Sequence, residues 1–149
     1  MRLVPEYLFD LNQTNLPAVQ IIASYHGLRL ADTHLEIFLE PEDEAWAAEY
    51  SRRWDENSRV VVLCPDWKQV VGLLDGEVTL LELSGEPTVL DASHALGYLP
   101  ICRTAALLRR VDCVLGVDSF PAHLAAAIGT PAVVLFGPTN SLLLQQQQK

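Results

Sequence analysis

The chain has 149 residues, of which 50 % are hydrophobic and 19 % are charged, and its formal net charge is −9. This length suits one domain with a core that needs no disulfides or metals. The acidic balance disfavours nucleic acid and anionic membranes as partners, because both are bound through basic patches. A small anionic ligand stays compatible with it, since backbone amides at a helix start hold phosphate without Lys or Arg.

The cysteines and the chain start indicate a cellular compartment. Cys64, Cys102 and Cys113 lie in apolar contexts and predict buried free thiols. No Cys-x-x-Cys pair or Cys/His cluster indicates zinc, and we expect neither a metal nor another cofactor. Acidic residues stand where a signal peptide needs an apolar run, and no run approaches the ~20 apolar residues of a membrane span. We therefore expect a cytoplasmic protein without a transmembrane segment.

Residues 1–40 predict a helical segment and a linker. The stretch "LPAVQIIASYHGL" has apolar residues at helical spacing and a stop at Gly27, and "THLEIFLE" alternates like a strand or an extended connector. The next segment, "PEDEAWAAEYSRRW", predicts the clearest helix, because Pro41 suits the first turn and the charges at both ends match the helix dipole. We interpret its acidic run as a solvated helix start rather than as a metal site.

Short apolar strands and helices alternate in the rest of the chain. Strands are predicted in "RVVVLCP", "EVTLLELSG", "VDCVLGV" and "PAVVLF", with a further one in "PTVLDAS", and helices in "WKQVVGLLDG", "LPICRTAALLRR" and "PAHLAAAI". This alternation predicts an α/β, Rossmann-like domain over residues 41–140, with a parallel sheet covered by helices on both faces. Each crossover is expected to be right-handed. Residues 141–149 are expected to form a disordered tail.

The stretch "VDSFPAHLAAAIGTPAVVLFGPT" concentrates polar residues around the start of one predicted helix. Asp118 or Ser119 suits the N-cap, where its side chain would accept a hydrogen bond from the N–H of Ala122 or His123. The amides of Ala122, His123 and Leu124 would then face an anion, which makes Ala122 and His123 candidate ligand-binding residues. In an open parallel sheet this is where ligands lie, beyond the carboxyl ends of the strands.

Two interpretations of this stretch stay open on the residues alone: an anion-binding site, or residues that only start and end a helix. The turn after the next strand repeats the pattern, because Gly137 permits close approach of a ligand and Thr139 offers a hydroxyl. His123 is not expected to be a general base, since no Ser or Cys is visibly paired with it.

At these residues the sequence resembles glycosyltransferase family 9, the ADP-heptose:lipopolysaccharide heptosyltransferases. Members are similar around an Asp-Ser/Thr-Gly-Pro-x-His-Leu-Ala loop, a Gly-x-Pro and a strand ending in Phe-Gly-Pro-Thr. The resemblance covers roughly residues 18–140. The matching residues are Asp118, Ser119, Pro121, His123, Leu124 and Ala125, then Gly129 and Pro131, then Phe136, Gly137, Pro138 and Thr139.

The resemblance implies the C-terminal, donor-binding half of a GT-B architecture, in which two Rossmann-like domains enclose the active site. It implies that the loop from Asp118 to His123 holds the diphosphate of a nucleotide-sugar through main-chain amides, and that Asp118 reaches the sugar. It also implies that no metal is required, because the helix end stabilises the leaving diphosphate. The implied reaction is inverting transfer of the sugar to an acceptor hydroxyl.

Three departures from the family pattern qualify what the resemblance implies. Phe120 stands where the family has Gly, and its side chain is expected to narrow the diphosphate approach or alter the choice of donor. Lys68 and Glu86 are approximate counterparts of the family's phosphate-contacting and ribose-binding residues. The acceptor-binding half, which carries the catalytic base, is not matched, so we assign no catalytic residue and expect a truncated enzyme.

Three functions therefore compete. The first is a domain that binds an ADP-heptose-like donor and works with a separate acceptor-binding domain or as a homodimer. The second is a non-catalytic remnant or interaction domain of the same fold. The third is a nucleotide- or phosphate-binding module of another Rossmann-like type, which ranks last because the sequence has no GxGxxG or GxxxxGK[ST] stretch.

Overall fold

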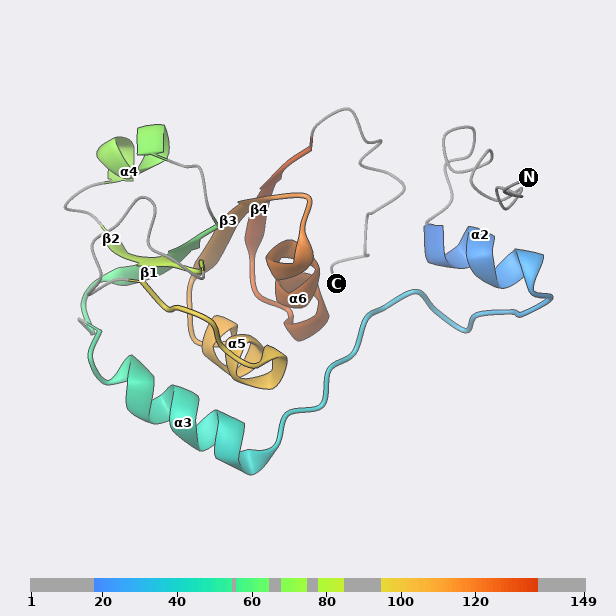
Figure 1. Ribbon diagram of the computed structural model, residues 1–149, viewed down its shortest axis with the longest axis horizontal. Coiled ribbons are helices and arrows are strands. Elements are labelled where there is room, and N and C mark those ends of the chain that lie inside the picture. Colours follow the sequence, from blue (N-terminus) through green and yellow to red (C-terminus); the bar gives the residue numbers. More distant parts are fainter. Residues whose placement is uncertain (1–17, 55, 65–67, 75–77, 85–94, 137–149) are drawn as a thin grey trace. The chain divides into compact units, whose positions relative to one another are not determined.

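The computed structural model describes residues 18–54, 56–64, 68–74, 78–84 and 95–136 (Figure 1). These residues fall into two units, which are described separately. One unit holds residues 18–35 and 136, and the other spans Glu36–Leu135. In the first unit, helix α2 (Ala18–Tyr25) ends as predicted before Gly27, which has φ +66°. The amide of Leu28 then donates to the carbonyl of Ala23 at 2.9 Å and closes the helix end.

The unit Glu36–Leu135 is built on a four-stranded parallel sheet with the order β2-β1-β3-β4. The strands are β1 (Arg59–Leu63), β2 (Val78–Glu82), β3 (Cys113–Val117) and β4 (Ala132–Leu135). The predicted α/β fold with a parallel sheet is confirmed. The additional strand predicted in "PTVLDAS" lies outside the described residues.

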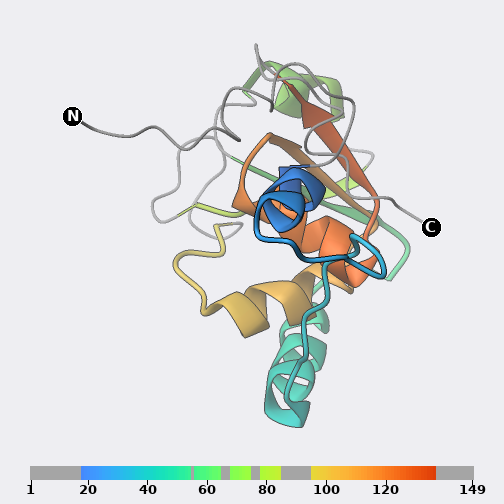
Figure 2. The ribbon, with the colours of Figure 1, turned by 90° about the vertical axis from the view of Figure 1, so that its right-hand side faces the viewer.

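Helices cover both faces of this sheet. Helices α3 (Pro41–Ser51), α5 (Ile101–Leu108) and α6 (Phe120–Ile128) lie on one face, and α4 (Lys68–Leu74) lies on the other, as Figures 1 and 2 show. Alternate residues of β1 explain this arrangement: Val60 and Val62 enter the core on the side of α5, whereas Val61 and Leu63 enter the smaller core on the side of α4. Within the described ranges, no helix combines the length and the apolar composition that crossing a bilayer requires.

Helix α3 is attached to α5 by charged and aromatic side chains. The guanidinium of Arg103 lies over the ring of Trp46, 5.3 Å from its centroid, and its Nε lies 3.7 Å from a carboxylate oxygen of Asp43. Arg109 donates to Glu44 at 2.6 Å. The acidic start of α3 is therefore partly paired with α5, and the expectation of a simply solvated helix start was wrong.

Candidate functional site at the start of helix α6

The direction of the chain across the sheet reverses at β1. From β1 the chain passes through α4 to β2 on one side, and from β2 it passes through α5 to β3 on the other side of β1. The two crossover helices therefore lie on opposite faces of the sheet (Figure 1). In open parallel sheets, ligands bind outside the carboxyl ends of the strands at such a reversal. Asp118 and Ser119 follow β3 directly and lie at this position.

The strands on either side of the reversal approach each other closely because residue 116 has no side chain. A Cβ atom at Gly116 would lie 3.1 Å from Sγ and 3.3 Å from Cβ of Cys64. The amide of Cys64 donates to the carbonyl of Leu115 at 2.9 Å, which extends the pairing of β1 and β3 to the edge of the site. Gly116 and Cys64 thus fix the spacing of the two strand ends below the loop.

The cysteines differ in their environments. Cys64 is buried as predicted, and burial raises the pKa of its thiol to about 11, so the thiol is protonated at neutral pH. Burial also raises the pKa of Cys113, although Cys102 and Cys113 are only partly buried and the expectation of three buried thiols was wrong for these two.

The start of α6 is organised by its backbone. Ser119 occupies the N-cap with an extended conformation (φ −156°, ψ 174°), and its carbonyl accepts from the amides of Ala122 at 3.1 Å and His123 at 3.4 Å. The predicted side-chain cap is wrong, because the hydroxyl of Ser119 donates instead to the carbonyl of Val117 at 3.3 Å. The amides of Ala122 and His123, which we expected to face a ligand, thus have an acceptor inside the helix.

Two backbone donors stay available at this helix start. Among the residues that the structure places, the amides of Ser119 and Phe120 have no hydrogen-bond acceptor. Pro121 has no N–H, so these two amides carry the unpaired donors of the first turn. They lie at the positive end of the helix dipole, where an anion is stabilised.

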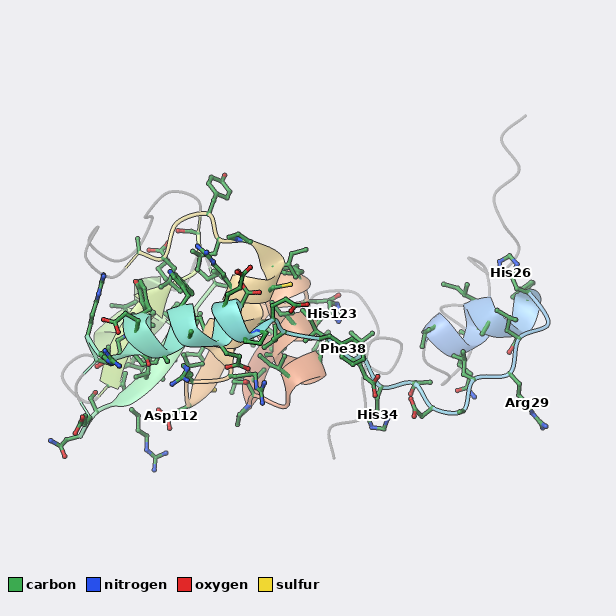
Figure 3. All side chains as sticks on the ribbon, turned by 90° about the horizontal axis from the view of Figure 1, so that it is seen from below. His26, Arg29, His34, Phe38, Asp112 and His123 are labelled. Carbon is green, nitrogen blue, oxygen red and sulfur yellow. The ribbon has the colours of Figure 1, made fainter. Side chains whose placement is uncertain are left out.

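A carboxylate and an imidazole meet beside these amides. Oδ1 of Asp118 lies 3.4 Å from Nε2 of His123, and the two side chains are 23 % and 34 % exposed. The contact is a hydrogen bond when Nε2 carries the proton. Sequence reasoning did not pair these residues, because the pairing depends on how the turn folds back over the helix start. Asp112 directly precedes β3 and His123 follows it, and Figure 3 shows the two residues apart. The carboxylate of Asp112 accepts a hydrogen bond from the amide of Val60 at 2.7 Å.

Sequence reasoning also missed a buried carboxylate at the carboxyl end of β2. Glu82 is fully buried, Oε1 accepts from the hydroxyl of Ser84 at 3.1 Å, and its carbonyl accepts from the amide of Leu96 at 2.8 Å. The available signal was a single acidic residue inside the apolar "LLEL". Because these bonds hold the segments after β2, we assign Glu82 a structural role.

The remaining predicted residues are distributed as follows. Phe120 is the first residue of α6 and is 49 % exposed. Lys68 is the first residue of α4, and the placement of its side chain is not described. Glu86, Gly137 and Thr139 lie outside the described residues. In the described portion of the chain, no three His, Cys, Asp or Glu side chains gather as ligands of a metal ion would.

Comparisons with known proteins agree with the fold. The model of glycosyltransferase family 9 (heptosyltransferase) matches residues 40–146. Lipopolysaccharide heptosyltransferase 3 of Escherichia coli is 49 % identical over 46 residues, which are 31 % of this chain and 14 % of that protein. The crystal structure of a glycosyl transferase of family 9 from Veillonella parvula has the same fold, with a TM-score of 0.64 at 18 % identity, over 86 % of this chain and 45 % of that chain. The matched parts thus span less than half the length of each of these two relatives.

Proposed function

Because the chain belongs to glycosyltransferase family 9, we propose that the start of α6 binds the diphosphate of a nucleotide-sugar donor. One observation carries the proposal: the Asp118–His123 pair lies beside the unpaired amides of Ser119 and Phe120. These groups follow β3, where the direction of the chain across the sheet reverses. The same place in the fold therefore offers donors for an anion and a carboxylate for hydroxyl groups. The net charge of −9 makes this local arrangement necessary, since the chain as a whole repels anions.

The amides of Ser119 and Phe120 would donate to oxygens of the diphosphate. Backbone N–H groups fixed by a helix need no rearrangement when charge develops on the leaving group, so they favour the transition state as well as the bound donor. The dipole of α6 adds to this effect within the first turn. In this proposal the helix start supplies the positive potential that a cation would otherwise supply.

Asp118 and His123 would exchange their mutual contact for contacts with the donor. The imidazole of His123 would donate from Nε2 to a phosphate oxygen, and the carboxylate of Asp118 would accept a hydroxyl of the sugar. Both side chains are partly exposed, so a ligand can reach them from the solvent. The proposed donor-binding residues are therefore Asp118, Ser119, Phe120 and His123. Ala122 is not among them, because its amide already donates to the carbonyl of Ser119.

The proposed reaction is inverting glycosyl transfer from an ADP-heptose-like donor. An acceptor hydroxyl forms a bond to the anomeric carbon, the bond from that carbon to the diphosphate oxygen breaks, and the diphosphate leaves with the electron pair. The hydroxyl proton passes to a base. We assign the acceptor site and the base to an acceptor-binding domain, supplied by a longer chain, a separate chain or a second copy, because the described residues around α6 offer only the donor-binding groups.

Isothermal titration calorimetry tests the donor-binding step. ADP-heptose, GDP-mannose and UDP-glucose are titrated separately into the protein, and the corresponding nucleoside diphosphates are used as competitors. We expect one nucleotide-sugar to bind and its own diphosphate to compete with it. If none of the three produces heat or raises the thermal unfolding temperature, the donor-binding proposal is wrong and the interaction-domain interpretation takes its place.

A further inference from the structure

Phe120 is a half-exposed aromatic residue at a position where a smaller or polar residue would serve the fold as well. It is the first residue of α6 and retains 49 % of its surface in water, so folding gains only part of the free energy that burying a phenyl ring provides. Its own amide is one of the two unpaired donors of the helix start. The ring and the donor therefore belong to the same residue.

The direction of a side chain at this position follows from helix geometry. Each Cα–Cβ bond in an α-helix is tilted toward the N-terminus, and a long side chain covers the turn that precedes its own Cα. No helical turn precedes Phe120, so we expect its ring to extend past the helix end. The unpaired amides of Ser119 and Phe120 belong to the same helix end, so we expect an atom that accepts from them to lie near this ring.

The chemistry of this space suits a sugar better than a phosphate alone. A phenyl ring cannot donate to a phosphate oxygen, but it provides apolar contact area. Asp118, two residues earlier, provides a partly exposed carboxylate. A hexose or heptose ring presents an apolar face of C–H groups and an edge of hydroxyls, and binding sites for such ligands combine apolar or aromatic walls with a few placed polar groups.

We propose that Phe120 contacts the apolar face of the donor's sugar while Asp118 accepts the sugar's hydroxyls, so that Phe120 determines the preference for a nucleotide-sugar over the free nucleoside diphosphate. This inference rests on the proposed donor-binding function. The opposite role, a ring that obstructs the site, is disfavoured because a half-exposed side chain changes rotamer at small cost and can turn away from a ligand.

Calorimetry with ADP-heptose and with ADP separates the two roles. We expect Phe120→Gly and Phe120→Ala to weaken the binding of ADP-heptose by about fivefold to tenfold, as the loss of one aromatic contact implies, and to change ADP binding less than about twofold. Phe120→Trp keeps a ring at the position and should retain the affinity for ADP-heptose. Thermal unfolding of each variant confirms that it folds.

Ile101→Gly is the matched control, since Ile101 is the first residue of α5 and is 58 % exposed. This variant carries the same backbone change at another helix start and should leave both affinities unaltered. Equal losses for ADP-heptose and ADP in Phe120→Gly, or tighter binding of ADP-heptose, would overturn the inference and leave the donor site in place. If the unaltered protein binds neither ligand nor any other nucleotide-sugar, the proposed function fails, and the inference fails with it.

Discussion

Helices α5 and α6 begin at the same edge of the sheet, and their starts look alike in several respects. Each has an exposed apolar first residue, Ile101 or Phe120, and in each the N-cap side chain makes no capping bond. In the described part of the chain, the first amides of α5, those of Ile101 and Cys102, are as free of acceptors as those of α6. Unpaired amides and a helix dipole therefore do not by themselves distinguish the two.

The difference lies in the side chains around each start. In α5 the carbonyl of Pro100 accepts from both the amide and the hydroxyl of Thr104, at 2.9 and 3.1 Å, and Arg103 is held against α3. In α6 a carboxylate and an imidazole, Asp118 and His123, face each other beside the free amides. The comparison indicates that α5 uses its first turn to join helices, whereas α6 presents polar groups at the reversal of the sheet.

The largest expected effect comes from removing the charge that distinguishes α6. Asp118→Asn should weaken donor binding by about 10-fold to 100-fold, because a hydrogen bond to a charged group is worth about 1.5–3 kcal/mol. Its free energy of unfolding should change by less than about 1 kcal/mol, since a partly exposed ion pair contributes little. Calorimetry and urea unfolding measure the two effects.

Asp112→Asn is the control for this variant. Asp112 accepts a hydrogen bond from the amide of Val60 and lies at the opposite end of β3 from Asp118, so the substitution should lower stability and leave donor affinity unchanged (Figure 3). Unchanged donor affinity in Asp118→Asn would remove the feature on which the comparison of the two helix starts depends.

The strand end below α6 should make stability depend on alkaline pH. The thiol of an unfolded chain ionises near pH 9, whereas burial raises the pKa of Cys64 to about 11 in the folded protein. The unfolded state therefore loses its proton first as the pH rises, and the free energy of unfolding should fall by up to about 2–3 kcal/mol between pH 9 and 11. Urea unfolding across this range should show a weaker dependence in Cys64→Ala, and identical slopes in both proteins would contradict a buried thiol.

Gly116→Ala tests the close approach of β1 and β3 below the site. The new methyl group would lie 3.1 Å from Sγ of Cys64, and we expect a loss of about 1–2 kcal/mol of stability from overpacking. Combining it with Cys64→Ala removes the sulfur and should recover part of that loss in a double-mutant cycle. Additive losses in the cycle would show that the two side chains do not compete for space.

The smallest effect is expected at the start of α5. Thr104→Val removes the hydroxyl that donates to Pro100, and the carbonyl keeps its bond from the amide of residue 104, so the cost should be about 0.5–1 kcal/mol. Donor affinity should not change. A loss of donor binding in this variant would mean that α5, rather than α6, holds the ligand.

The sequence predicted the fold well where burial repeats along the chain. Strands buried on both faces must be continuously apolar, so "RVVVLCP" indicated β1, and Pro41 with the charges at both ends indicated α3. Apolar character alone does not decide burial: Ile101 lies in the predicted helix "LPICRTAALLRR" but is exposed, because the first residue of the helix lies beyond the core.

The site was predicted less completely, because its contacts depend on the turn rather than on a repeating pattern. The positions of Asp118 and Ser119 after a strand were evident, and so was their place before a helix. The Asp118–His123 contact and the bond from Ser119 to Val117 could not be inferred, since both require the backbone angles of the turn. The burial of Glu82 likewise depends on segments that come together only in the folded chain.

Amide chemical shifts measure the central claim most directly. The ¹⁵N-labelled protein is titrated with ADP-heptose, and the shifts of Ser119 and Phe120 at the start of α6 are compared with those of Ile101 and Cys102 at the start of α5. The donor-binding proposal predicts large, saturable shifts at Ser119 and Phe120 and small ones at α5. Saturable shifts confined to Ile101 and Cys102, or no saturable shift at either helix, would contradict it.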